Sequence, residues 1–148
     1  MQRQTWFGDI FIDCPTALIA SAAVNNNRNA SAVYKMIFDA STGFHGSTAP
    51  YLANTNLDWK GVENQTLAAI MTSYWISFAV THDPNELRLS NAPLWPAYVS
   101  GGNVTAQVGD GVGFSTLVIA DTTITSVRDR DVGARCDFIG GNGYVIMH

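Results

Sequence analysis

Charged residues are scarce in this sequence, and no cluster of lysine and arginine occurs in it. Its 148 residues are 14% charged and carry a net charge of −4, whereas a soluble domain is usually about 25% charged. Because no basic stripe is present, the chain lacks the electrostatic footprint of a nucleic-acid-binding protein. The low charge also predicts that part of the surface faces more protein.

Long apolar runs are missing as well. No stretch approaches the ~20 apolar residues of a membrane-spanning helix. The N-terminus "MQRQTWFGDIFIDCP" has no long apolar core of the kind that a secretion signal carries. We therefore expect no membrane span and no signal peptide within this sequence.

Metal-binding residues are few. The sequence holds two cysteines, Cys14 and Cys136, near opposite ends, and three scattered histidines. A metal site needs several such ligands at close spacing, so we expect no metal and no cofactor. By themselves the cysteines fit either two buried thiols or one disulfide. The glycines of "GDGVG" (109–113) lead into a strand rather than a helix, which favours a turn over a phosphate-binding loop.

Three N-x-[ST] sequons are candidate N-glycosylation sites, at Asn29, Asn64 and Asn103. Together with a possible disulfide they favour a secreted protein. Since a signal peptide is missing, we expect that the chain lacks its natural N-terminus.

Hydrophobic patterning predicts alternating helices and strands. We expect a helix from Asp9 to about Val24, which Pro15 begins or kinks. A short apolar strand follows at 32–38, typical of a parallel sheet. A long loop covers 39–61, and a loop of this length is usually functional or disordered.

The second half begins with the clearest helix, in residues 62–81. Its apolar residues repeat with helical spacing and predict one buried stripe: Leu67, Ile70, Met71, Tyr74, Trp75 and Phe78. "HDPN" (82–85) ends this helix because proline excludes helical geometry before it. We expect a β-branched strand at 115–125 and a helix at 126–138 that "GGNGY" breaks.

The segment "STGFHGSTAPY" (41–51) places His45 between two glycines, shortly after the strand expected at 32–38. In open α/β sheets, ligand sites lie outside the carboxyl ends of the strands. Histidine is also the side chain best suited to move protons near neutral pH. His45 is therefore the candidate catalytic residue, and a solvated loop histidine is the alternative.

Six segments follow one another in the order found in a known family. They are "GDIFIDCP" (8–15), "YKMIF" (34–38), "FHGSTAPY" (44–51), "YWISFAVTHDPN" (74–85), "LWPAY" (94–98) and "RCDF" (135–138). On these segments the chain resembles the C-terminal part of the type B carboxylesterases, the cholinesterase and fungal lipase family of α/β hydrolases.

The resemblance implies an α/β fold in which residues 1–148 form the C-terminal fragment of an α/β-hydrolase domain, with few strands and flanking helices. It implies that His45 takes a proton from a serine as that serine attacks a carboxylic ester, and then returns the proton to the leaving alcohol. It also implies a disulfide between Cys14 and Cys136, in a full-length protein that is secreted.

The chain departs from the family in several ways. It has no G-x-S-x-G, the nucleophile elbow that exposes the serine, and the family's acid and oxyanion-hole glycines come from segments further upstream. Thr48 stands where many members carry an acidic residue, and His82 replaces the glycine of "TGDPN". The tail "IGGNGYVIMH" replaces a helix that contains tryptophan. We therefore expect the missing N-terminal part of the fold to supply serine and acid, and this chain alone to be inactive.

Three hypotheses remain open at this point. The first is a fragment of an esterase whose partner is a carboxylic ester substrate. The second is a non-catalytic cholinesterase-like binding or adhesion module, which lacks the triad. The third is an unrelated small domain with an accidental resemblance, in which Cys14 and Cys136 need not approach each other.

Overall fold

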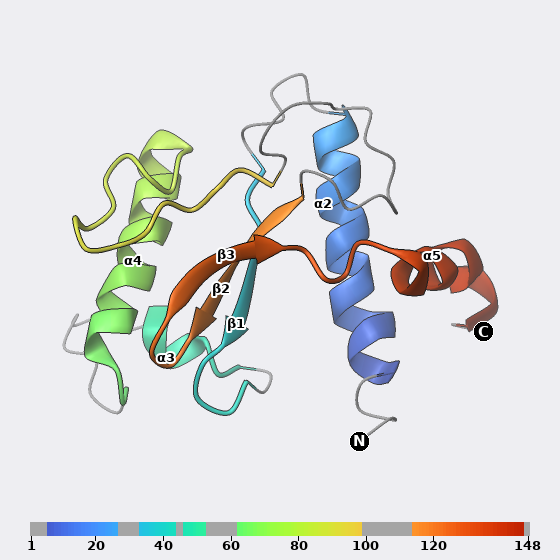
Figure 1. Ribbon diagram of the computed structural model, residues 1–148, viewed down its shortest axis with the longest axis horizontal. Helices are drawn as coiled ribbons and strands as arrows, with labels where there is room; N and C mark the ends of the chain where they lie inside the picture. The colour runs from blue at the N-terminus through green and yellow to red at the C-terminus, as the bar shows by residue number, and fades with distance from the viewer. Residues whose placement is uncertain (1–5, 27–32, 44–45, 53–61, 99–113, 147–148) are drawn as a thin grey trace. The chain divides into compact units, whose positions relative to one another are not determined.

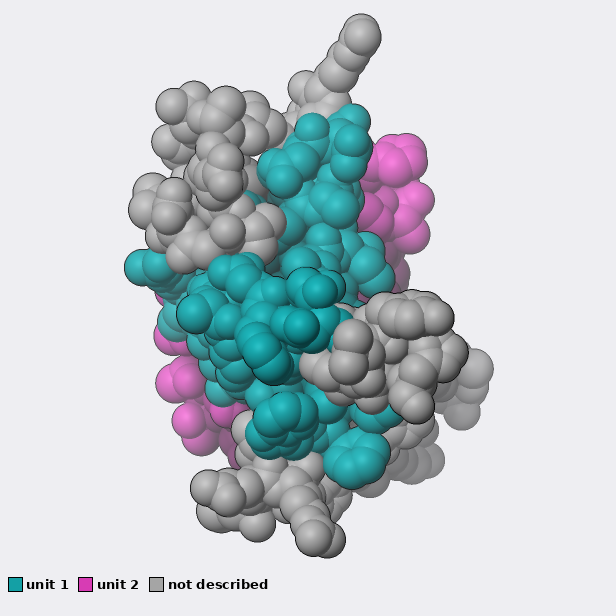
Figure 2. All heavy atoms as spheres, turned by 90° about the vertical axis from the view of Figure 1, so that its right-hand side faces the viewer, with its two compact units in different colours: residues 1–35, 96–116, 127–148 teal, residues 36–95, 117–126 magenta. Residues whose placement is uncertain are grey.

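The computed structural model describes residues 6–26, 33–43, 46–52, 62–98 and 114–146. The chain divides into two compact units (Figures 1 and 2). The first unit comprises residues 1–35, 96–116 and 127–148, and the second unit comprises residues 36–95 and 117–126. Each unit is described by itself.

The first unit begins with a helix that changes its geometry before a proline. η1 (Asp9–Asp13) is a π-helical turn, and α2 (Cys14–Asn26) continues it as an α-helix. The backbone amide of Cys14 bonds to the carbonyl of Asp9. Pro15 comes next and has no amide to donate, which places the irregular turn where regular helix bonding is interrupted. The helix expected from Asp9 to Val24 is confirmed.

This helix is longer and more apolar than the sequence patterns indicated. Residues Trp6–Asn26 span 21 residues, and an 18-residue window within them has a mean hydropathy of 1.5, enough in length and composition to cross a membrane. Signal sequences and core helices of soluble proteins meet the same criterion. The absence of a membrane span and of a signal peptide therefore stays a prediction.

The last helix of the first unit corrects two expectations. α5 (Ala134–Ile146) runs through "GGNGY", which was expected to break it, and residues 126–133 are not helical. α5 packs against α2 and η1. A Cβ atom added to Gly140 would lie 3.0 Å from a methyl carbon of Leu18. Glycine is tolerated there because it lets the two helices approach closely, which offsets its low helix propensity.

The apolar core of the first unit gathers around one tyrosine. Tyr98 is fully buried with Val24, Phe114 and Val132. Its ring centroid lies 5.0 Å from that of Phe114. Its backbone amide also bonds to the carbonyl of Val33, so it joins three separate segments of the chain.

The sheet has three strands in the order β1-β2-β3: β1 (Met36–Asp39), β2 (Ser115–Ala120) and β3 (Ile124–Arg128). β1 and β2 are parallel. β2 and β3 form an antiparallel hairpin, because Ala120 bonds to Thr123 and Asp129 bonds to Phe114. The described residues therefore form helices and a small mixed sheet. This agrees with the expected α/β class.

The hairpin corrects the single strand expected at 115–125. Asp121, Thr122 and Thr123 form a turn within that range, and the chain then reverses direction. The sequence patterns missed this turn because it contains neither glycine nor proline. The strand expected at 32–38 is also shorter, and begins at Met36.

The second unit holds the helix that the sequence predicted most clearly. α4 (Gln65–Thr81) begins after Asn64 and ends at His82. A short helix, α3 (Ala49–Leu52), packs against it within the stretch expected to be loop. The expected stripe is buried from Leu67 to Tyr74. The prediction is wrong for the last turns of the helix, because Trp75 and Phe78 are exposed. The buried side chain there is Ser77.

Candidate functional site

The loop that follows β1 starts at the carboxyl edge of the parallel strand pair. The last residue of β1, Asp39, is in register with Ala120, so the chain leaves both strands at the same edge. Asp121 follows β2 directly, and its Oδ1 accepts a hydrogen bond of 2.6 Å from the amide of Ser41. This bond fixes the start of the loop at the edge where open α/β sheets place their ligand sites.

The described parts of this loop are tight turns. Gly43 has φ 63° and Gly46 has φ 87°, values that glycine adopts without steric cost. The amide of Gly43 bonds to the carbonyl of Ala40, and the amide of Ala49 bonds to the carbonyl of Gly46. Both glycines that flank the candidate histidine therefore serve turns.

Several sequence-based candidates lie outside the described residues: His45, Asn29, Asn103 and residues 109–113. Their roles stay predictions. The structure does describe the two cysteines and the remaining sequon.

Cys14 and Cys136 form a disulfide, as the resemblance implied. Their Cα atoms lie 5.0 Å apart across 122 positions of sequence. Both are buried, and they pack with Ile10 and Ile139. The bond fastens the start of α2 to α5. An accidental resemblance does not predict this pairing.

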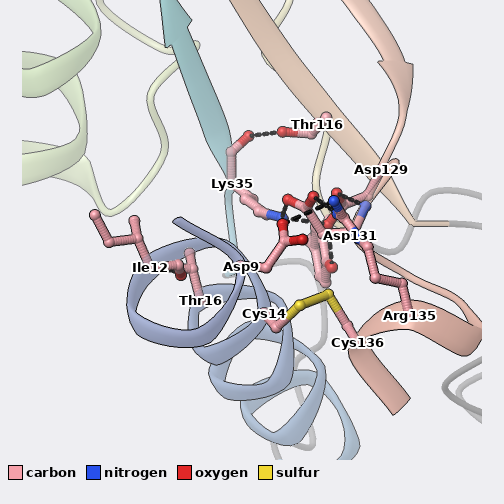
Figure 3. Close-up of polar contacts among 11 residues, drawn as sticks. Asp9, Ile12, Cys14, Thr16, Lys35, Thr116, Asp129, Asp131, Arg135 and Cys136 are labelled. Atoms are coloured by element: carbon pink, nitrogen blue, oxygen red, sulfur yellow. Dashed lines mark hydrogen bonds and ion pairs between the residues drawn. A yellow bond between two sulfur atoms is a disulfide. The ribbon is translucent and has the colours of Figure 1, made fainter. Parts of the chain in front are cut away.

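A largely buried ionic cluster links η1, the residue before β1, the segment after β3 and α5 (Figure 3). The Nζ of Lys35 lies 2.6 Å from Asp129 Oδ2 and 2.8 Å from Asp131 Oδ2. The guanidinium of Arg135 lies 2.7 Å from Asp9 Oδ1 and 2.8 Å from Asp131 Oδ1. All of these side chains except that of Arg135 are more than nine-tenths buried. Because a buried charge is costly unless it is paired, each partner holds the others in place.

Tyr98 extends the cluster by a hydrogen bond to one of its carboxylates. Its hydroxyl lies 2.6 Å from Asp129 Oδ2 and donates to it. Burial, and then this bond, raise the pKa of Tyr98. Burial alone would raise the pKa of Asp129, but the hydrogen bonds from Lys35 and Tyr98 hold it below 3.8. Ionised Asp129 therefore stabilises the fold above roughly pH 4, and that stability is lost as the pH falls through the lowered pKa.

The carboxylates of the cluster are paired with cationic side chains. Within the described residues, no group of three His, Cys, Asp or Glu side chains is arranged to hold one. Asp9, Asp129 and Asp131 instead receive hydrogen bonds from Lys35 and Arg135. The pairing of these charges favours a structural role for the cluster.

The cluster brings together four of the six segments that carry the resemblance. Asp9 belongs to "GDIFIDCP", Lys35 to "YKMIF", Tyr98 to "LWPAY" and Arg135 to "RCDF". Sequence reasoning did not find these contacts. The charges of "VRDRD" (127–131) lie in the range where a helix was expected, and Lys35 is 94 and 96 positions away from Asp129 and Asp131. The unusual signal was Lys35, a single cation inside an apolar strand.

The segment "HDPN" is held by its own polar side chains. Asn85 donates from Nδ2 to the carbonyl of Trp95 and accepts at Oδ1 from the amide of Trp95. It also donates to Asp83 Oδ1. These hydrogen bonds join the segments "YWISFAVTHDPN" and "LWPAY". Asn85 therefore has a structural role.

His82 occupies the position where the family has glycine. It caps the C-terminus of α4 with φ 62°, in the left-handed region. Glycine adopts this conformation most easily, and histidine adopts it more often than most residues. His82 therefore adopts a backbone conformation that glycine would adopt at lower cost.

Asn64 is the sequon that the structure describes. Its Oδ1 accepts a hydrogen bond of 2.9 Å from the amide of Leu67, which caps α4. Its Nδ2 donates a hydrogen bond of 2.7 Å to the carbonyl of Asp121. Asparagine is among the preferred N-cap residues, so the position has a structural use independent of any glycan.

The comparisons with known proteins found no protein-family model that matches this chain and no matching solved structure. The resemblance to the type B carboxylesterases therefore stays a prediction from the six sequence segments.

Proposed function

We propose that this chain is the C-terminal portion of a secreted carboxylic ester hydrolase and supplies the catalytic histidine, His45. The observation that carries the proposal is the loop after β1. It leaves the carboxyl edge of two parallel strands, is fastened there through Ser41 and Asp121, and turns at the two glycines beside His45.

In this proposal His45 is the general base of a serine nucleophile that the upstream part of the protein contributes. It accepts the serine proton as the ester carbonyl is attacked, donates it to the leaving alcohol, and then activates the water that releases the acid. The Cys14–Cys136 disulfide and the ionic cluster support the proposal indirectly. They join residues of several matched segments to one another, as a common fold would require.

The exposed apolar surface of each unit is in keeping with a missing partner. The first unit exposes large side chains on its N-terminal helix: Trp6, Phe7, Phe11, Ile12 and Ile19. The second unit exposes others on α4: Trp75, Ile76, Phe78 and Val80. Among the described strands only β2 pairs with β1, so the other edge of β1 is open to a further strand. Apolar faces of this kind are typical of surfaces that other protein covers.

The coding frame upstream of Met1 tests the proposal. An in-frame G-x-S-x-G followed by an acidic residue supports the hydrolase. A frame in which the serine is substituted supports the non-catalytic binding module instead. The 148-residue chain alone should not react with a fluorophosphonate serine probe, and a covalent adduct on it would contradict the assignment of the nucleophile to the upstream part.

A further inference from the structure

The sequon at Asn64 lies at the edge of a groove in the second unit. The groove has a volume of about 200 Å³. Its lining includes Asn64 and Thr66, the two residues that define the sequon. The sequon therefore lies beside a groove that is already present in the chain without a glycan. The position of this groove is an observation separate from the sequence motif.

The lining of the groove combines apolar and polar side chains. Leu67 and Ile70 are buried side chains of α4, and they form its apolar part together with Pro93 and Ile124. The remaining side chains offer hydroxyl, amide and carboxylate groups: Asn64, Thr66, Asn91, Asp121, Thr122 and Thr123. No lysine or arginine lines it. Such a surface suits a neutral ring with one apolar face and several hydroxyl groups.

The size of the groove favours one such ring. Its volume equals that of about seven water molecules and is smaller than the roughly 300–1,000 Å³ of most small-molecule pockets. One sugar ring with its substituent is of this size.

We propose that Asn64 is N-glycosylated and that the first N-acetylglucosamine of its glycan packs into this groove. The inference rests on the secretory location in the proposed function and not on the esterase chemistry. The sugar ring lies over Leu67 and Ile70, and its hydroxyl groups bond to the threonines of the turn between β2 and β3.

The chemistry of attachment is compatible with the cap. The Nδ2 amide of Asn64 has two hydrogens, and the bond to the Asp121 carbonyl uses one of them. An oligosaccharyl transferase acting on a lipid pyrophosphate donor breaks the bond between the sugar C1 and the phosphate oxygen. It forms the bond from C1 to Nδ2, and Nδ2 loses its other proton to a base. Oδ1 remains an acceptor for the amide of Leu67.

The first measurement is site occupancy. The full 148-residue chain, directed into the secretory pathway of eukaryotic cells, is digested and its glycopeptides are identified by mass spectrometry. We expect Asn64 to carry a glycan. The control Thr66→Ala removes the sequon and leaves the Asn64 cap intact, so it should abolish this glycan while Asn29 and Asn103 are unaffected. An unmodified Asn64 overturns the inference, whether or not Asn29 and Asn103 are modified.

The second measurement is protection of the first sugar. Peptide-N-glycosidase F cuts the bond to Asn64, whereas endoglycosidase H cuts one sugar further out. If the ring is docked for nine-tenths of the time, native cleavage by the first enzyme slows about tenfold relative to the denatured chain, while the second enzyme is unaffected. The variant Thr122→Tyr fills the groove from an exposed turn and should restore fast cleavage. Equal native and denatured rates without this variant overturn the docking. None of these outcomes depends on esterase activity.

Discussion

The first unit joins distant segments through ion pairs and a disulfide, whereas the second unit, in its described residues, is held by hydrogen bonds. In the first unit, ion pairs link residues 94 to 126 positions apart, and a disulfide spans 122. In the second unit, β1 pairs with β2, and Asp121 accepts hydrogen bonds from Ser41 and Asn64, which lie 80 and 57 positions away. Shorter-range hydrogen bonds to the backbone link residues 6 to 19 positions apart, from Ser77 to Asp83, Asn85 to Trp95 and Tyr74 to Pro93.

This difference shows how one chain stabilises two kinds of segment. Closing a long loop costs entropy, and the first unit offsets this cost with a covalent bond and ion pairs. The second unit offsets it with the β1–β2 ladder and with hydrogen bonds from Ser41 and Asn64 to Asp121. Burial raises the pKa of Tyr74 to about 12, with Arg88 opposing, so its hydroxyl remains a donor across the physiological range. The comparison predicts that reductant or the removal of a charged side chain destabilises the first unit. The second unit should instead be destabilised by the loss of single side chains that hydrogen-bond to the backbone.

The largest effect is expected from removing the disulfide. In the Cys14→Ser/Cys136→Ser variant, the chain-entropy estimate for a loop of this length gives a loss of about 5 kcal/mol in unfolding free energy. Urea unfolding followed by circular dichroism measures the loss, and hydrogen exchange locates it. Protection should fall in α2 and α5 and persist in α4. Equal loss of protection in α4 would contradict the comparison.

The next effect is expected from Lys35→Met. The variant leaves the Asp129 and Asp131 carboxylates buried without their lysine, and removing one partner of a buried pair costs about 3–5 kcal/mol. Arg130→Met is the matched control, because Arg130 is exposed and surface changes are usually within about 0.5 kcal/mol.

A double variant sharpens this test. Lys35→Met combined with Asp129→Asn removes one of the unpaired charges, so it should lose less stability than the sum of the two single changes. Additive losses in urea unfolding would mean that the pair is not coupled.

The sequence predicted the helices of this fold better than its polar contacts. Pro84 and the residues before it marked the end of α4, because proline acts on its nearest neighbours. The hairpin at Asp121 and the continuation of α5 through Gly140 depend on packing against other segments, which no local pattern reports. The predicted burial of Trp75 on α4 was wrong for the same reason. The buried residue there is Ser77, whose hydroxyl bonds to the carbonyl of Asp83 and to the amide of Leu87.

The candidate site was predicted in part. The cysteines were paired by the resemblance, and the structure confirms that pair. The ionic cluster was missed because hydrophobic periodicity assigns charges to the surface, and Lys35 is buried only because Asp129 and Asp131 meet it there.

A smaller effect is expected from Asn85→Asp in the second unit. The change keeps the shape of the side chain but removes the amide donors to Trp95 and Asp83, and it places a second carboxylate beside Asp83. Leaving such groups unsatisfied costs about 1–3 kcal/mol. The exposed Asn91→Asp is the control. Thermal unfolding that is equally affected by both variants would show that these hydrogen bonds contribute nothing specific.

The smallest effect has the opposite sign. His82→Gly relieves the left-handed backbone at the end of α4 and should stabilise the chain by about 1 kcal/mol or less, after the greater flexibility of glycine in the unfolded chain is deducted. His82→Asn keeps a residue that tolerates this conformation and should change little. A loss of stability in His82→Gly would show that the histidine side chain makes a contact of its own.

The most direct test of the central claim is the turnover of an ester by the longer protein that the upstream frame encodes, with His45→Gln compared with His82→Gln. Loss of a triad histidine lowers kcat by roughly 10⁴–10⁶-fold. We predict a loss of this size for His45→Gln and only a few-fold change, at most, for His82→Gln. Equal turnover by the His45→Gln variant and the parent would contradict the assignment of His45 as the catalytic base.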